Sequence, residues 1–264
     1  MIKKTIRNFL NRRTFTYKIR NKAMNTFSSY KNLKTLREKS ESNRLKENRN
    51  HEVLYFHKTD DPYSHLTIQF IDKLKEEYSI DLVPVLVGQE NPEALHEPDL
   101  YEKYCLEDVR RISPYYGIEF NGVSYPETPL INKANSILAS TEPNNFIEIA
   151  KKVSNYLWAN DEEELSKLQH QFNAPMSKVN EVLSNGNKIR NDCDYYFGSA
   201  FYYEKELYWG VDRLNHLEER LAELGAKKTP TNESIAPLSI KAPERLNSDK
   251  LLNLTYYPSL NSPY

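Results

Sequence analysis

Residues Glu52 to His57 read EVLYFH, and residues Ile80 to Val87 read IDLVPVLV. Both runs are short, apolar and rich in the residue types that favour β-strands. Between them lies a turn at residues 58–62, and apolar side chains then recur at helical spacing, at Leu66, Phe70, Ile71, Leu74 and Tyr78. A strand, a helix and a second strand in so short a stretch predict a right-handed βαβ unit with parallel strands.

The chain after this unit predicts a helical block and then a hairpin. The expected helices are Asn145 to Trp158, Asp161 to Phe172 and Pro175 to Leu183. Ser199 to Tyr203 and Leu207 to Trp209 predict two strands around Glu204-Lys205-Glu206. A last helix carries leucines on one face, and Gly225 is its expected C-terminal stop. The order β-α-β, helices, β-β-α is typical of an α/β thioredoxin-like fold, in which a central mixed sheet carries an inserted helical subdomain.

The two ends of the chain differ from the middle. Residues 1–49 hold 15 Lys+Arg against three Glu, whereas the other 215 residues hold 21 basic and 34 acidic side chains. Ile2, Ile6, Phe9 and Leu10 favour a short amphipathic basic helix at the start. Such an arm could touch nucleic acid, an anionic membrane or an import receptor, or it could dock on its own acidic body, which we consider the better reading.

Five of the 14 prolines and no glycine lie in residues 227–264, which argues against regular structure there. Several apolar side chains in this tail suggest that it wraps over the body. We therefore divide the chain into a basic N-terminal arm at 1–50, a domain at 51–226 with a helical insertion at about 95–185, and a Pro-rich C-terminal tail at 227–264.

Three short motifs resemble one protein family. Tyr55 to Leu66 (YFHKTDDPYSHL) resembles a segment in which Ser-Pro-Tyr-Ser follows the first strand, and Leu207 to Leu214 (LYWGVDRL) resembles an aromatic-Gly-x-Asp-Arg motif before the last helix. Tyr104-x3-Asp108-x2-Arg111 resembles the entry to the insertion. The family is the DsbA-like thioredoxin superfamily, in the branch of 2-hydroxychromene-2-carboxylate isomerases and kappa-class glutathione transferases.

The resemblance implies a glutathione site at the amino end of the first helix, where unpaired N–H groups and the helix dipole stabilise a thiolate. It places Asp61 where the family has the serine that contacts the glutathione sulfur, with Tyr63 and Ser64 beside it. An ionised carboxylate cannot donate a hydrogen bond and repels a thiolate. Asp61 followed by Pro62 is also a favoured helix start, so a capping role is the stronger interpretation.

Other expected glutathione contacts are Asp212 for the γ-glutamyl amine, Asn91 in Asn91-Pro92, and Ser199 at the family's cis-proline position. Asp212 is equally suited to cap the last helix, and a turn residue is the simpler interpretation of Asn91. The chain departs from the family at Asp61, at Ser199, at Tyr101 in place of a lysine and at Val211 in place of a serine.

No CxxC pair occurs, because the two cysteines, Cys105 and Cys193, lie far apart in the sequence. A dithiol oxidase is therefore a weak hypothesis, and Cys193 is more often a buried structural cysteine than a residue of the site. His57 and His65 lie near Asp60 and Asp61, but we assign no metal site. Tyrosine pairs such as Tyr195-Tyr196 could line a pocket for an aromatic substrate or simply fill the core.

Two functions remain open. The first is a glutathione-dependent isomerase or transferase with glutathione as cofactor and a small, aromatic substrate, in which Asp61 or Ser64 replaces the usual serine. The second is a catalytically degenerate thioredoxin-like binding module. We expect no specific nucleic acid, no membrane span and a cytoplasmic location, and a homodimer is possible.

Overall fold

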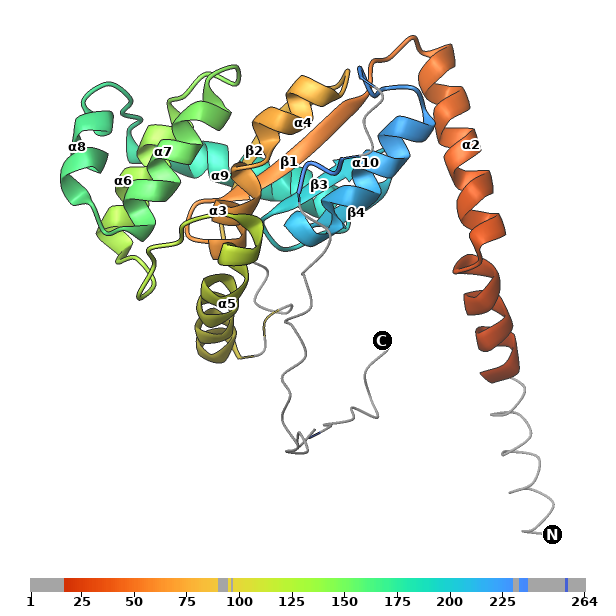
Figure 1. Ribbon diagram of the computed structural model, residues 1–264, viewed down its shortest axis with the longest axis horizontal. Coiled ribbons are helices and arrows are strands. Elements are labelled where there is room, and N and C mark those ends of the chain that lie inside the picture. Colours follow the sequence, from red (N-terminus) through yellow and green to blue (C-terminus); the bar gives the residue numbers. More distant parts are fainter. Residues whose placement is uncertain (1–16, 90–94, 96, 230–232, 237–254, 256–264) are drawn as a thin grey trace, which may run out of the picture.

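The computed structural model describes residues 17–89, 95, 97–229, 233–236 and 255. Its centre is a four-stranded mixed sheet in the order β2-β1-β3-β4 (Figure 1). β1 (Glu52–Lys58) pairs in parallel with β2 (Asp81–Val87) and antiparallel with β3 (Ala200–Tyr203), which pairs antiparallel with β4 (Glu206–Trp209). β2 is an edge strand, and this position tolerates Pro84 because only one side of the strand is hydrogen-bonded.

The sheet is covered on both faces because its strands alternate between two apolar clusters. Val53 and Tyr55 join the large cluster with α3 (Pro62–Ile68), α4 (Ile71–Glu77) and α10 (Leu214–Glu223). Phe56 joins a smaller cluster on the other face, where α9 (Met176–Asp192) packs against β2. This is the expected α/β thioredoxin-like fold.

The helical insertion lies between β2 and β3 and forms the left-hand part of Figure 1. Its helices are α5 (Pro98–Ile112), the 3-10 turn η2 (Ser113–Tyr116), α6 (Thr128–Ala139), α7 (Phe146–Trp158), α8 (Glu162–Gln169) and α9. Three of these were expected, whereas α5 and α6 were not. Each of the two unexpected helices begins at or next to a proline, which is favoured in the first turn but resembles loop sequence when read alone.

Two helix boundaries differ from expectation. The helix expected through Tyr78 is broken into α3 and α4, because the N–H groups of Gln69 and Phe70 bond three residues back and Phe70 turns its ring edge onto Tyr116. α9 continues nine residues past Leu183, through Gly186. A Cβ built on Gly186 would lie 1.9 Å from the Leu86 carbonyl oxygen, so glycine here allows close contact between helix and strand.

The end of the last helix and the hairpin agree with expectation. Gly225 has a φ of 76° and follows α10. In the tight turn of the hairpin, Glu204 and Lys205 have φ values of 46° and 71°. Two positive φ angles are typical of a two-residue hairpin turn, although glycine or asparagine usually occupies such positions.

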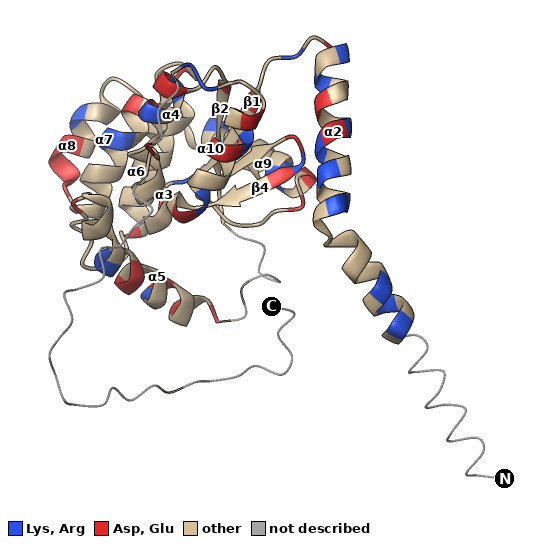
Figure 2. Cartoon of the chain, turned by 45° about the vertical axis from the view of Figure 1, so that its right-hand side comes forward, with Lys and Arg blue, Asp and Glu red and all other residues tan. Residues whose placement is uncertain are grey.

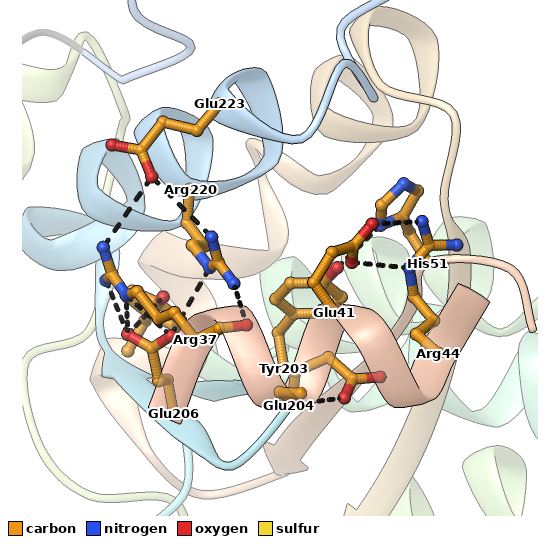
Figure 3. Close-up of polar contacts among 11 residues, drawn as sticks. Arg37, Glu41, Arg44, His51, Tyr203, Glu204, Glu206, Arg220 and Glu223 are labelled. Atoms are coloured by element: carbon orange, nitrogen blue, oxygen red, sulfur yellow. Dashed lines mark hydrogen bonds and ion pairs between the residues drawn. The ribbon is translucent and has the colours of Figure 1, made fainter. Parts of the chain in front are cut away.

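The part of the basic arm from Arg37 to Arg49 docks on the acidic hairpin (Figure 3). Within α2 (Tyr30–Lys46), the Arg37 guanidinium donates to both carboxylate oxygens of Glu206, with Nη2 2.6 Å from Oε2. Ser40 and Arg49 both donate to Glu204. The Arg220 side chain of α10 reaches the Arg37 carbonyl oxygen at 3.4 Å. Docking on its own body is therefore what this part of the arm does.

Two further expectations concern the ends of the chain. The helix expected at Ile2 to Leu10 lies outside the described residues, as does most of the tail. Of the tail, Ile235 and Ala236 are buried in the main cluster, and the Ile235 N–H donates to the Glu218 carboxylate of α10 at 3.1 Å. No described helix is both long enough and apolar enough to cross a bilayer.

Candidate functional site

Asp61 is the N-cap of α3. Its Oδ1 accepts the N–H of Tyr63 at 3.0 Å, and its Oδ2 accepts the N–H of Ser64 at 3.1 Å and the Ser64 hydroxyl at 2.8 Å. The carboxylate thus takes the first backbone donors of the helix, the groups that would otherwise stabilise a bound anion. The capping interpretation is confirmed, and the negative charge at this helix start belongs to the protein itself.

Ser64 is buried and its hydroxyl has two partners. It donates to Asp61 and accepts the Lys58 N–H at 3.2 Å, so it ties the end of β1 to the first turn of α3. Gly198 lies against the same turn, because a Cβ built on it would be 2.7 Å from the Lys58 Cβ and 3.0 Å from Asp61 Oδ2. The hydroxyl therefore holds the turn together and is not presented to solvent.

Tyr63 is half-buried and points toward α5. Its hydroxyl donates to Asp108 Oδ2 at 2.7 Å, and burial followed by this hydrogen bond raises the pKa of the phenol far above its usual value. Tyr63 therefore stays protonated at any physiological pH, as a hydrogen-bond donor and not a base. Asp108 belongs to the motif Tyr104-x3-Asp108-x2-Arg111, which was the sequence signal for it.

Ser199 lies directly before β3 and is fully buried. Its hydroxyl shares a 2.7 Å hydrogen bond with Thr67 of α3, and its carbonyl oxygen accepts the Gly210 N–H at 2.7 Å. The φ of Ser199 is 53°, in the left-handed region. Ser199 therefore fixes the hairpin onto α3, and its side chain does not reach the surface where a ligand would bind.

Asp212 lies in the 3-10 turn η3 (Val211–Arg213) that precedes α10, and it makes no capping hydrogen bond. Its side chain is 57% exposed, and Oδ2 is 2.9 Å from Arg213 Nη1. Of the two alternatives for Asp212, the capping role is thus wrong, and the carboxylate remains accessible. Val211, by contrast, is buried in the main cluster.

The starts of α3 and η3 lie on the same side of the molecule. The Tyr63 ring packs edge-on against Trp209, the last residue of β4, with ring centroids 5.9 Å apart. Burial raises the pKa of Tyr116, and the carboxylates of Asp212 and Asp108 raise it further. The family-like motifs around Asp61 and Asp212 are therefore brought together, whereas Asn91 lies outside the described residues.

Aromatic rings cover the surface beside Asp61, and we name this set the aromatic platform. Tyr101 stacks on Phe197 with centroids 5.5 Å apart, and Phe197 stacks on Trp209 with centroids 5.6 Å apart. Trp209 is 39% exposed, and Tyr63 closes the row. Tyr101 fills the position where the resemblance implies a lysine, so a stacking residue stands in place of a cation. Sequence reading missed Phe197, which follows the Tyr195-Tyr196 pair.

The surroundings of the aromatic platform are acidic. Burial raises the pKa of Tyr125, and Cys105, Asp61, Glu102 and Asp60 raise it further. Lys58 pairs with Asp60 at 3.5 Å. The carboxylate of Asp61 disfavours an anionic ligand beside it, because like charges repel more strongly where water is partly excluded, whereas Asp60 is paired with Lys58.

Neither cysteine forms a redox pair. Cys105 is buried on α5 near Tyr63 and Tyr101, and burial raises the pKa of its thiol to about 12. Cys193 packs with the small cluster around Phe56, and burial raises its pKa as well. A thiol with a raised pKa is a poor nucleophile because little thiolate forms.

The two histidines near the site are core residues. His57 is 1% exposed, lies 3.1 Å from the Tyr55 hydroxyl and meets Phe146 edge-on. His65 is 2% exposed, and its Nδ1 lies 2.9 Å from the Ser154 hydroxyl of α7. Burial lowers their pKa values to about 3 and about 4, so both are neutral at pH 7. No cluster of metal-ligating side chains occurs among the described residues.

Comparison with known proteins identifies the fold. No protein-family profile and no curated protein sequence matches the chain. A solved 2-hydroxychromene-2-carboxylate isomerase is similar over 66% of this chain and 96% of its own, with 17% identity and a TM-score of 0.46. A candidate protein disulfide isomerase from Nitrosomonas europaea is similar over 66% and 97%, with 15% identity and a TM-score of 0.50. The chain has a thioredoxin-like fold with an inserted helical region.

Proposed function

We propose that this chain is a DsbA-like thioredoxin-fold protein that binds a neutral aromatic ligand on the aromatic platform and does not use thiolate chemistry. The observation that carries the proposal is the Asp61 cap. Its carboxylate takes the N–H groups of Tyr63 and Ser64 and the Ser64 hydroxyl, which are the donors that would stabilise a bound thiolate. What remains accessible beside the cap is the stacked row that ends at Trp209.

The platform suits a flat apolar ligand for two reasons. Tyr101, Phe197 and Trp209 are already stacked with interplanar angles of 16° and 17°, so a further ring can continue the stack without reorganisation. The carboxylates of Asp61 and Asp108 oppose a ligand with a negative charge. A small neutral aromatic molecule meets both conditions.

Binding can be tested with 2-naphthol and 2-naphthoate, a neutral and an anionic form of the same ring system. Titrations followed by saturation-transfer NMR are expected to show binding of the naphthol and at least tenfold weaker binding of the naphthoate. Trp209→Ala should abolish the binding of 2-naphthol. Tyr115→Ala is the matched control, because Tyr115 is an exposed tyrosine outside the platform and its loss should change nothing. Equal binding of both probes, or binding that survives Trp209→Ala, contradicts the proposal.

A glutathione-dependent isomerase or transferase is the second candidate, and Asp212 favours it. Its carboxylate is accessible on the same side as the start of α3 and matches the position that receives the γ-glutamyl amine in the family that the sequence resembles. Calorimetric titration decides the matter. Heat that disappears in Asp212→Ala but persists in the control Asp192→Ala supports this candidate, whereas no heat and no thermal shift at millimolar glutathione removes it.

Glutathione titration of Asp61→Ser shows whether the Asp61 charge blocks a glutathione site or whether the chain has no such site. Serine restores the residue of the family and still caps the helix, while it removes the charge that would face the glutathione sulfur. If glutathione binds, its affinity should rise severalfold in this variant. The cytoplasmic location and a homodimer stay predictions from the sequence.

A further inference from the structure

The helix at residues 17–27 precedes α2 and extends away from the body (Figure 1). Its large apolar side chains are exposed: Tyr17 by 57%, Ile19 by 54%, Met24 by 56% and Phe27 by 71%. Within the described part of the chain, these side chains have no apolar core to join. Exposed apolar groups gathered on one element indicate a surface that meets another apolar phase.

The apolar side chains share one face of this helix. Ile19, Ala23 and Phe27 are spaced by four residues, and Tyr17 and Met24 are spaced by seven, so all five fall within less than half of the circumference. Lys18 and Lys22 lie on the opposite side. Arg20 lies among the apolar residues, and its long side chain can carry the guanidinium out to a polar boundary.

The charge of this part of the arm is uniformly positive. The first acidic residue is Glu38, and ten Lys+Arg precede Arg37. Figure 2 shows basic residues along the protruding helix, with acidic ones only further up the arm, on α2. Among the described residues, Lys18, Arg20, Lys22 and Lys31 make no ion pair, whereas Arg37 and Arg49 are used to dock on the body. Docking thus leaves Lys18, Arg20, Lys22 and Lys31 available.

We propose that the helix at 17–27 is an interfacial anchor that lies on an anionic lipid surface. The positive charge alone would fit a nucleic acid equally well. The exposed face of Tyr17, Ile19, Met24 and Phe27 favours a membrane over a nucleic acid, because burying aromatic and aliphatic side chains at the acyl boundary of a bilayer lowers the free energy. The arm then holds the thioredoxin-like body beside the membrane, through the contacts of Arg37 and Arg49 with the hairpin. No helix needs to cross the bilayer for this.

Co-sedimentation of the full chain with lipid vesicles tests the proposal. Vesicles of phosphatidylcholine with added phosphatidylglycerol are expected to bind at least tenfold more protein than phosphatidylcholine alone, since each basic residue near an anionic surface adds about 1 kcal/mol. Binding should weaken as salt increases. Circular dichroism of each variant shows whether the body is still folded.

Three double variants separate the contributions. Lys18→Glu with Lys22→Glu should reduce binding at least tenfold. Ile19→Gln with Phe27→Gln, which removes the apolar face without adding charge, should reduce it as strongly. Lys178→Glu with Lys188→Glu, which makes the same charge change on α9, should leave binding within twofold of the unmodified chain.

Three results overturn the proposal. One is equal binding to both kinds of vesicle, and another is vesicle binding unaffected by Ile19→Gln with Phe27→Gln. The third is the absence of binding to either kind of vesicle. Binding of the full chain to duplex DNA, or self-association that the same apolar variant abolishes, would then identify what the helix contacts.

Discussion

At the scale of single residues, Asp61 determines which groups at the start of α3 remain free to bind a ligand. One carboxylate accepts two backbone N–H groups and one hydroxyl, and it puts a negative charge at the helix start. The fold places this helix start beside the hairpin, and its first backbone donors are already occupied by Asp61. In both functions proposed above, ligand binding therefore depends on side chains beyond the helix end, namely the aromatic platform and Asp212.

Replacing Asp61 with alanine should destabilise the protein by about 1 to 2 kcal/mol, because the cap is lost and the Ser64 hydroxyl loses its acceptor in a buried position. Urea unfolding followed by circular dichroism measures this change. Asp61→Asn keeps an oxygen acceptor at the cap and should cost only a few tenths of a kcal/mol. If the two variants were equally stable, the side-chain cap would not be the role of Asp61.

At the scale of the element, the sequence predicts what depends on short-range pattern. The strands Glu52–Lys58 and Asp81–Val87, the hairpin and the stop at Gly225 all follow from apolar runs and turn residues. The break between α3 and α4 could not be predicted, because it depends on where Phe70 meets Tyr116 across the molecule. The helix α6 had a usable signal in Leu130, Ala134, Ile137 and Leu138, which the loop-like Glu127-Thr128-Pro129 obscured.

The candidate site shows the same limit. Asp61, Tyr63 and Ser64 could be placed at a helix start from local sequence, and the pairing of this helix start with Asp212 from the family-like motifs. Phe197 and Tyr101 could not be brought together, because their stacking joins residues 96 positions apart in the chain through the fold alone. A helix cap depends on residues that are close in the sequence, whereas the aromatic platform combines residues from several elements of the fold.

Gly186 shows how one residue sets the distance between two elements. Gly186→Ala should destabilise the protein by about 3 kcal/mol, because the new Cβ would overlap the Leu86 carbonyl of β2 and force α9 away from the strand. Thermal unfolding of the unmodified chain and of Gly186→Ala measures this loss of stability. Gly117→Ala is the control, since no atom lies within 4 Å of its Cβ and only the φ of 67° is strained, which costs about 1 kcal/mol. Equal losses in the two variants would mean that the contact with Leu86 is not limiting.

At the scale of the whole molecule, the arm is attached to the body mainly by charge. Arg37 faces Glu206 at 2.6 Å and Glu223 at 3.8 Å, and both Arg37 and Glu206 are largely covered. Arg37→Glu places a like charge against these carboxylates, and we expect trypsin to cut within α2 about five to ten times faster, which corresponds to about 1 kcal/mol. Lys34→Glu is the control, because it also removes one trypsin site and lies one helical turn earlier. Lys34 is exposed, so trypsin should cut this variant within α2 at nearly the rate of the unmodified chain. Similar acceleration in both variants would show that Arg37 does not hold the arm.

The second coupling at this scale joins the sheet to the helical insertion through two neutral histidines. His57 of β1 meets Phe146 and His65 of α3 meets Ser154, and both partners belong to α7. Their pKa values fall from 6.5 to about 3 and about 4 because burial disfavours the charged form. Between pH 4 and pH 6.5 the unfolded chain therefore binds more protons than the folded one, and the free energy of unfolding rises with pH.

Stability from these histidines should thus be complete above about pH 6.5 and decline below it, by up to about 1.4 kcal/mol per pH unit for each histidine until the folded-state pKa is reached. Urea unfolding across this range measures the slope. His57→Phe removes one titrating group and should lower the slope by up to about half, whatever its effect on stability at neutral pH, whereas the exposed His170→Gln should leave the slope unchanged. A slope that stays the same in His57→Phe would mean that acid destabilises the molecule through carboxylates instead, and that contact between the sheet and α7 does not depend on a neutral imidazole.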